Sequence, residues 1–429
     1  MNPPAGPVGA RLRGTRGGLV LGLSMLAILS QFYRSSIAVV APELVHDLSL
    51  TPQALGLAGG VFFLALGIVQ VPVGMAFDRV GPRLTVAWIS ALAFAGALVL
   101  AFAADGTDLI AGRFLLGAGC GASFMSAVVM LVRWYPRERI GTMVARIFAF
   151  SQVGNFAAAT PMAWLTETVG WRAVFGASAV VSAAVVAFFV WAARDQPPGQ
   201  APVRVAAEPL ARTLRGFGEV LRTKDYKRVI AIHAVAYASV ATVLGLWSGP
   251  YLHDAFGLDG VGRGHVLLAT SAAQVAGLLW LVPLERRLNS RKIVIVAGAL
   301  AVAAILLALA ILPAPPVALA IALLVVLAGV GTYSPIIIAH ATSLVPPTLQ
   351  GRGSATANIG QVAGAFLLPV ATGAIAGCFE STSGGYPLVA YRLIFAALAI
   401  ALVAGIAVYL GARDARPRPD GPPTGTRSP

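Results

Sequence analysis

Long apolar segments recur along the chain with short polar connections between them, and this pattern predicts a helical membrane protein. A spanning helix needs ~20 mostly apolar residues, and about twelve segments reach that length. We place six spans near residues 17–42, 54–76, 85–104, 108–132, 142–164 and 173–192. We place six more near residues 229–251, 264–284, 293–312, 317–343, 354–377 and 389–411. The predicted fold class is all-α, a polytopic bundle of twelve transmembrane helices.

Residues 193–228 form the only long polar interruption, and they divide the chain into two parts. We expect an N-terminal six-helix half over 1–192 and a C-terminal six-helix half over 229–411. The interruption is then a cytoplasmic central loop, and 412–429 is a cytoplasmic tail. Within the loop, the stretch from Pro209 to Arg222 favours a short surface helix.

The two halves repeat one another weakly, which favours a duplication. Five residues of the first half recur 210 positions later, namely Pro136, Gly141, Ala145, Gly154 and Phe156, matched by Pro346, Gly351, Ala355, Gly364 and Phe366. Two parallel halves related in this way predict a cavity between them near the middle of the bilayer.

Composition agrees with a membrane protein, because 58% of the residues are hydrophobic and only 11% are charged. A soluble domain carries about a quarter charged residues. We interpret the net charge of +14 as a sign of the orientation of the chain in the membrane, not of a nucleic-acid partner. The even-numbered connections and the two tails hold 25 of the 31 Lys and Arg residues. Positive residues stay in the cytoplasm, so we expect both termini on the cytoplasmic side of the plasma (inner) membrane.

The chemistry of the chain gives no sign of an enzyme. Its two cysteines, Cys120 and Cys378, indicate neither a disulfide framework nor a metal site. No nucleophile and base stand at a spacing typical of catalysis, and no motif indicates a cofactor. The first apolar run is too long for a signal-peptide core, so we expect it to be retained as a span.

Arg34 is the most informative residue, because it lies inside the first apolar run. A cation at membrane depth costs at least ~2.5–3.5 kcal/mol and usually faces a water-filled cavity. Helical spacing places Ser30, Gln31 and Ala38 on the same face, with Tyr33 beside it. A guanidinium suits carboxylate and phosphate groups. We therefore predict that Arg34, together with Gln31 and Tyr33, contacts an anionic substrate, while a purely structural role for Arg34 stays open.

The connection between the second and third spans carries a recognisable motif. Gly74, Asp78, Arg79, Gly81 and Arg83 match the pattern G-x-x-x-D-R-x-G-x-R at the expected place. This segment resembles the loop signature of the major facilitator superfamily, and the resemblance extends over twelve spans, a central loop and two halves. It implies that these five residues belong to a cytoplasmic gate. We expect Asp78 to accept from helix amides or to pair with an arginine.

Two further motifs bear on that resemblance. The equivalent loop of the second half, Pro283 to Lys292, is degenerate, with Arg286 where the family has an acid. The fourth span contains Arg113 in an R-x-x-x-G-x-G pattern. Arg113 fits either substrate contact or a structural pin that donates to main-chain carbonyls. The fifth span has Pro161 without the paired glycines of the exporter-type members, which counts against drug–proton antiport.

Aromatic residues of the seventh and tenth spans are candidates for the substrate pocket. In the family that this chain resembles, spans one, four, seven and ten line the cavity. Tyr237, Trp247 and Tyr333 lie in those spans and could equally be packing residues or interfacial anchors. We expect His233 and His340 to be structural rather than proton relays.

The nearest candidates for ion coupling are Glu43, at the outer end of the first span, and Asp108, at the start of the fourth. A carboxylate that shares a cavity with arginines could titrate during a cycle. Transport of the protonated substrate, anion exchange and facilitated diffusion are the alternatives.

Together these features predict a monomeric secondary transporter that imports a small organic anion by alternating access, linked to protons. Its partners would be the anionic substrate, the lipid bilayer and protons. Multidrug or metabolite efflux, or a sensor that keeps the carrier fold, are the rival hypotheses. Efflux of cationic drugs predicts acids in the cavity, and a sensor predicts a larger cytoplasmic platform.

Overall fold

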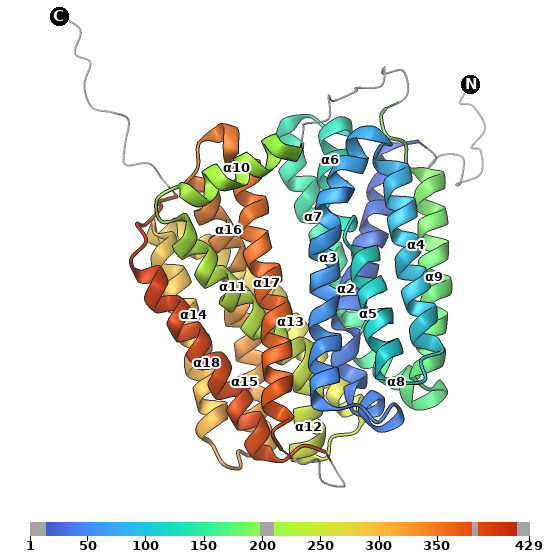
Figure 1. The fold of residues 1–429 in the computed structure, drawn as a ribbon, viewed down its shortest axis with the longest axis vertical. Coiled ribbons are helices and arrows are strands. Elements are labelled where there is room, and N and C mark those ends of the chain that lie inside the picture. Colours follow the sequence, from blue (N-terminus) through green and yellow to red (C-terminus); the bar gives the residue numbers. More distant parts are fainter. Residues whose placement is uncertain (1–13, 198–209, 380–384, 418–429) are drawn as a thin grey trace, which may run out of the picture. The chain divides into compact units, whose positions relative to one another are not determined.

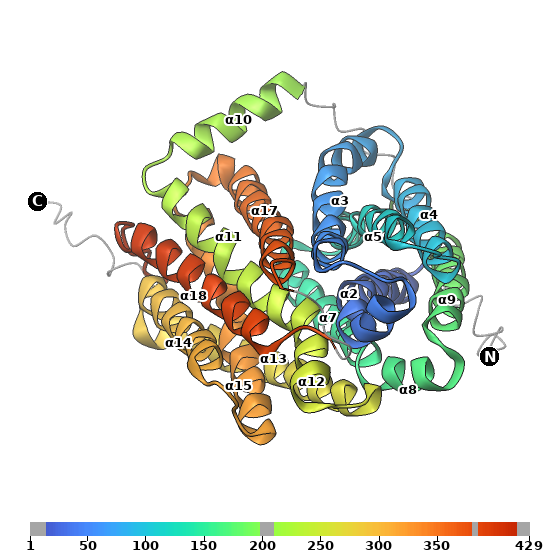
Figure 2. The same cartoon turned by 60° about the horizontal axis from the view of Figure 1, so that its bottom comes forward.

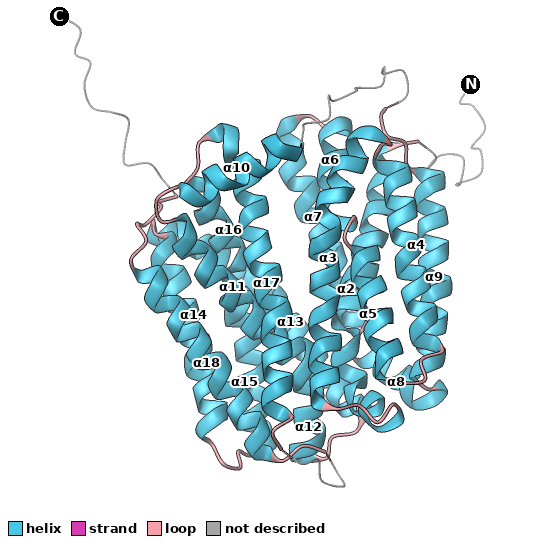
Figure 3. Ribbon diagram, viewed as in Figure 1, coloured by secondary structure: helices cyan, strands magenta, loops and turns pink. Residues whose placement is uncertain are grey.

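The computed structural model describes residues 14–197, 210–379 and 385–417, and within those ranges the chain consists of helices and loops (Figure 3). The helices up to the central loop are α2 (Arg16–Asp47), α3 (Pro52–Arg79), α4 (Pro82–Ala101), α5 (Gly106–Cys120), α6 (Ser123–Trp134), α7 (Arg137–Ala157), α8 (Thr160–Val169) and α9 (Trp171–Ala192). The later ones are α10 (Leu210–Arg222), α11 (Tyr226–Thr242), η1 (Val243–Trp247), α12 (Ser248–Phe256), α13 (Gly260–Leu288), α14 (Arg291–Ile311), α15 (Val317–Val330), η2 (Gly331–Tyr333), α16 (Ser334–Ser343), η3 (Pro347–Leu349), α17 (Gln350–Ala376) and α18 (Leu388–Leu410).

Eleven helices in the described part are long and apolar enough to cross a membrane. The remaining predicted span, the fifth, near 142–164, is realised as α7 and α8, with a break at Ala158 and Ala159. Arginines at 137, 139 and 146 make α7 less apolar than the other spans. The all-α fold with twelve membrane segments is confirmed, and the helix predicted in the central loop is present as α10.

Contacts between residues divide the chain into two compact units that do not follow the predicted halves. Of the described residues, the first unit contains 14–197, 241–271, 365–379 and 385–394. The second contains 210–240, 272–364 and 395–417. Helices α11, α13, α17 and α18 therefore contribute residues to both.

The first unit is built around α2, which packs against α7 and α9, while α4 packs against α5 and α9 (Figures 1 and 2). Small residues allow the close approaches. A Cβ added to Gly117 of α5 would lie 2.0 Å from the carbonyl oxygen of Phe62 on α3. Replacement of this glycine would therefore force the two helices apart.

Segments that follow the central loop complete the first unit at the end where α2 terminates. η1 and α12 pack on α2, and a Cβ added to Gly249 would meet the carbonyl oxygen of Ala38 at 1.8 Å. Gly56 of α3 approaches α17 in the same way, since its Cβ would lie 2.5 Å from the oxygen of Pro369. This end of the unit is closely packed.

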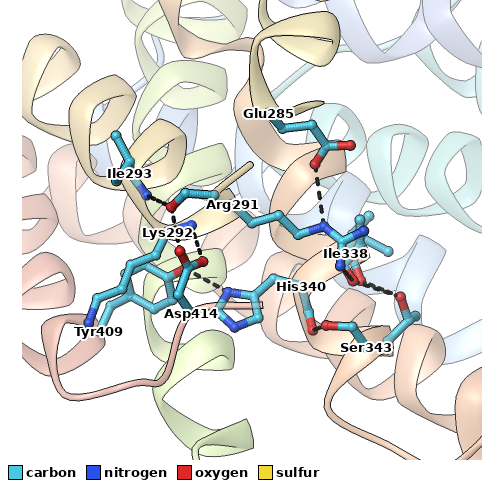
Figure 4. A network of polar contacts seen from close by, with 12 residues as sticks. Glu285, Arg291, Lys292, Ile293, Ile338, His340, Ser343, Tyr409 and Asp414 are labelled. Atoms are coloured by element: carbon cyan, nitrogen blue, oxygen red, sulfur yellow. Dashed lines mark hydrogen bonds and ion pairs between the residues drawn. The ribbon is translucent and has the colours of Figure 1, made fainter. Parts of the chain in front are cut away.

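A polar network holds one end of the second unit together (Figure 4). Asp414 accepts hydrogen bonds from the Ser290 hydroxyl, at 2.5 Å, and from the Lys292 main-chain N–H, at 2.9 Å. His340 shares a hydrogen bond of 2.6 Å with the Tyr409 hydroxyl. The Arg291 Nε atom lies 3.4 Å from the Glu285 Oε2 atom. The network joins the start of α14 to α16 and to the segment after α18.

Two helices, α4 and α14, begin in the same way. Asp195, which follows α9, accepts from the main-chain N–H of Arg83 near the start of α4, at 2.7 Å. Asp414, which follows α18, does the same for Lys292 near the start of α14. A carboxylate at a helix N-terminus satisfies an unpaired amide and favours the helix dipole. In each case an acid after one helix completes the start of another.

Asp225 organises a neighbouring part of the second unit. Its side chain is only 1% exposed and accepts hydrogen bonds from Arg228, at 2.5 Å, and Arg413, at 3.1 Å. Burial alone would raise the pKa of this carboxyl, but the hydrogen bonds from Arg413 and Arg228 outweigh burial and hold the pKa below 3.8.

We expect Asp225→Asn to destabilise the protein most at neutral pH. A carboxyl whose pKa is depressed by folding contributes stability above its unfolded pKa, and this contribution disappears as pH falls through the folded pKa. The midpoint of thermal unfolding should therefore be lower in the variant at pH 7, with a difference that shrinks below about pH 4. Glu219→Gln is the control, because Glu219 is exposed. A difference that does not change with pH would contradict this account.

Candidate functional site

Arg34 lies in the middle of α2 and is partly buried. The central carbon of its guanidinium is 5.5 Å from the centre of the Phe63 ring on α3. A cation over an aromatic face is stabilised by the ring quadrupole. Arg34 thus keeps a charged group at the depth of the predicted membrane core.

An array of amides joins α2 to α7 next to Arg34. Gln31 donates to the Gln152 side-chain oxygen at 3.1 Å, and Asn155 donates to the same oxygen at 3.3 Å. The Ser35 hydroxyl donates to Asn155 at 2.8 Å. Since Gln31 and Ser35 flank Arg34 on α2, the cation lies beside a strip of uncharged polar groups.

Gly154 lets α7 approach α2 closely enough for these amides to meet. A Cβ at this position would lie 2.1 Å from the carbonyl oxygen of Ile28. The array is buried, with exposed fractions of 6–8% for its three amide residues. Buried amides between helices are usually hydrogen-bonded, and within the described part the Gln31 oxygen still has no donor.

Arg113 lies on α5 and contacts the main chain of α2 next to Arg34. Its side chain is 1% exposed, donates to the main-chain oxygens of Tyr33 at 2.6 Å and Ala58 at 3.1 Å, and covers the Phe62 ring at 4.6 Å. Both bonded oxygens belong to helices that carry Arg34 or Phe63. Arg113 therefore holds the frame in which Arg34 sits, and its direct contact with a substrate stays a prediction.

Tyr33 fixes the turn from another side. Its hydroxyl donates to the Ser178 carbonyl at 3.0 Å and shares a hydrogen bond of 2.7 Å with the Ser182 hydroxyl, both on α9. The ring is completely buried. Tyr33 thus points into the interior of the first unit in this structure.

The aromatic candidates have different surroundings. Trp247, in the first unit, is fully buried, donates to Thr372 at 2.8 Å and packs edge-on against Tyr386 and Tyr391. Tyr333 is 1% exposed and lies in the second unit, as does the partly buried Tyr237. Contact of these three residues with a substrate stays a prediction.

The acids predicted for ion coupling are placed differently from each other. The Asp108 carboxylate accepts from the main-chain N–H of Ala104, at 2.9 Å, near the start of its own helix. Glu43 forms an ion pair with Arg263, at the start of α13, 220 residues later. One feature of the sequence could have indicated this partner, because Arg263 is one of the six Lys and Arg residues that lie outside the even-numbered connections and the tails.

The motif loop between α3 and α4 has the expected turn. The acid that accepts a hydrogen bond from the start of α4, however, is not Asp78 of the motif. Gly81 adopts φ = 97°, a conformation that favours glycine. Asp78 and Arg79 are exposed, and the carboxylate that accepts from the start of α4 is that of Asp195. Arg83 donates to the Val190 carbonyl at 2.8 Å. The gate role of Gly74 and the other motif residues stays a prediction.

We expect Arg113→Met to lower the thermal stability of the purified protein. The variant removes the donor to two buried carbonyl oxygens, a loss of about 1–3 kcal/mol in the free energy of unfolding. The midpoint of thermal unfolding in detergent should fall by a few degrees, whereas Arg139→Met, at an exposed position, should leave it unchanged. Equal midpoints for the two variants would show that the guanidinium does not hold these helices.

The sequence as a whole matches known transporters. A family model described as "Major Facilitator Superfamily" matches residues 23–369 and 229–429. A "Putative tartrate transporter" of Agrobacterium vitis is 26% identical over 406 residues, which cover 89% of this chain and 88% of that protein. A "Probable galactarate/D-glucarate transporter GudP" of Escherichia coli (strain K12) is 27% identical over 195 residues, or 42% of this chain and 41% of that protein.

Solved structures resemble the fold. A bacterial homolog of the human lysosomal transporter Spinster, inward-facing and occupied, has a TM-score of 0.71 at 17% identity and covers 92% of this chain and 96% of its own. A D-xylose–proton symporter has a TM-score of 0.70 at 15% identity, covering 90% of this chain and 96% of its own. At these identities the likeness concerns the fold alone.

Proposed function

Because this chain belongs to the major facilitator superfamily, we propose that it imports a small organic anion across the plasma (inner) membrane by alternating access linked to protons. The anionic group, a carboxylate or phosphate, binds Arg34. The six-helix halves, 1–192 and 229–411, move relative to each other, with both termini in the cytoplasm. The protein acts as a monomer and has no enzymatic activity.

One observation carries the proposal: Arg34 is a partly buried cation in a long apolar helix, beside buried amides. A cation at this depth is expensive and is retained where it serves a pathway. Two relatives are named for anions of this class, the "Putative tartrate transporter" and the "Probable galactarate/D-glucarate transporter GudP". Gln31 and Ser35 would then meet the uncharged polar groups of such a substrate.

The interior position of Arg113 supports an indirect role in the same site. Its hydrogen bonds to Tyr33 and Ala58 set where α2 and α3 lie at the level of Arg34. A rigid frame keeps a binding group in position and limits the entropy lost on binding. Arg113 is thus proposed as a positioning residue, with Arg34 as the contact.

We expect Arg34→Gln to weaken anion binding by roughly 10- to 150-fold, because a hydrogen bond to a charged group contributes about 1.5–3 kcal/mol. Arg34→Lys should show a smaller loss, since it keeps the charge without the bidentate fork. The measurements are substrate-induced thermal shifts and counterflow of tartrate, glucarate and phosphate esters in proteoliposomes.

Arg146→Gln is the matched control, because Arg146 also lies in a predicted span but is exposed. Anion binding that is unchanged in Arg34→Gln would remove Arg34 from the site. Exchange of cationic drugs but of no anion by the wild-type protein would contradict anion carriage itself and favour efflux.

A further inference from the structure

We infer that α10 and the turn after it bind anionic phospholipids at the membrane surface, at the end of the protein predicted to be cytoplasmic. Phe217 and Leu221 enter the apolar boundary of the bilayer, while Arg215, Arg222 and Lys224 bind lipid phosphate groups. This surface lies outside the substrate pathway, and the inference does not depend on which substrate the carrier moves.

The sequence of α10 separates apolar from charged residues. The apolar residues recur at spacings of four, three and four on one side of the helix: Leu210, Leu214, Phe217 and Leu221. The charged residues recur at spacings of three, four and three on the opposite side: Arg212, Arg215, Glu219 and Arg222. With 13 residues, α10 is too short to span a bilayer. A strongly amphipathic helix that is polar on average is typical of helices that lie in the plane of the membrane interface.

The connection to α11 keeps the end of α10 close to the membrane surface. A candidate membrane span runs from Tyr226 to Phe256, and Tyr226 follows the last residue of α10, Arg222, by four residues. Four residues reach at most ~14 Å. Figure 1 shows α10 at one end of the second unit, lying steeply across the direction of α11. The end of α10 therefore lies near the level at which α11 enters the bilayer.

A second contact ties the middle of α10 to the start of another span. A Cβ added to Gly216 would lie 2.5 Å from the Arg352 side chain on α17. The Tyr226 hydroxyl donates to the carbonyl oxygen of the next residue, Gly353. Arg352 and Gly353 lie near the start of the candidate span Pro347–Ala376. Because both its middle and its end are held at the entry level of membrane helices, α10 lies along the surface of the bilayer.

Burial shows which sides of α10 the protein leaves open. Gly216 and Val220 are buried and mark the side that packs on the second unit. Phe217 and Leu221 each follow one of them by a single residue, which is ~100° around a helix. Phe217 is half-buried and Leu221 is 37% exposed. The apolar side thus lies next to the packed side, where the lipid beside a membrane protein can cover it.

The charge around α10 selects anionic lipids. Arg215, Arg222 and Lys224 are exposed. Of the two acids in this stretch, Asp225 is already paired with arginines, as described above, and Glu219 is exposed. Clusters of basic residues next to a span attract the negative headgroups of acidic phospholipids. A free phosphate ion would satisfy the arginines but would leave Leu221 uncovered, so the combination fits a lipid.

The test measures hydrogen exchange of peptides that cover residues 215–224, with the protein in nanodiscs of phosphatidylcholine alone or of phosphatidylcholine mixed with phosphatidylglycerol. In the wild type, exchange should be about tenfold slower in the mixed discs, because lipid contact suppresses local opening of α10. The ratio of the two rates is the readout. It corrects for any effect of a variant on the intrinsic stability of the helix.

The double variant Arg215→Gln with Arg222→Gln should reduce this ratio to less than about threefold. The matched control is Arg137→Gln with Arg139→Gln, which removes two exposed arginines near the start of α7 and should keep the wild-type ratio. A wild-type ratio near one would overturn the inference. Equal ratios in the two double variants would overturn it as well, because α10 would then have no special part in lipid binding.

Two further measurements separate a lipid from other anionic partners. Leu221→Gln keeps every charge and should also reduce the ratio, because it removes apolar contact with the bilayer. Inorganic phosphate added to discs of phosphatidylcholine should leave exchange unchanged. Protection by inorganic phosphate, or a wild-type ratio in Leu221→Gln, would overturn the assignment to lipid and indicate a soluble anionic partner instead.

Discussion

An arginine inside an apolar helix bundle finds few groups that can compensate its charge, and this constraint determines how the helices of the first unit are held together. Arg113 meets the constraint with two main-chain oxygens and an aromatic ring. Arg34 lies over Phe63 beside the amide array, and Arg263 uses a carboxylate and a carbonyl. The three arginines are thus compensated by three different sets of groups. Arg113 and Arg263 are fully buried and hold helices together, whereas the partly buried Arg34 is the one that we propose to bind substrate.

Much of the fold could be predicted from the sequence, because length and hydropathy are decisive in a membrane. Apolar segments of spanning length predicted the twelve membrane segments, and the polar stretch predicted the helix now seen as α10. The fifth segment has a break that its pattern did not reveal. Its arginines lower the hydropathy of α7, and Ala158 and Ala159 separate it from α8.

The candidate site was less predictable, because periodicity shows which residues share a face but not what lies opposite. The face of Gln31 and Arg34 was correctly identified as polar, yet its partners Gln152 and Asn155 lie about 120 residues away. The same limit applied to Glu43, whose partner Arg263 is in the other half of the chain. Asp195, rather than Asp78, accepts from the start of α4 for the same reason.

The paired carboxylates at the starts of α4 and α14 have a consequence for biosynthesis. The ribosome must add 112 residues after Arg83 before Asp195 exists, and 122 residues after Lys292 before Asp414 exists. At each helix start, one main-chain N–H, that of Arg83 or of Lys292, receives its carboxylate acceptor only when that half of the chain has been translated. Maturation of the second half therefore waits for the residues that follow the last membrane helix.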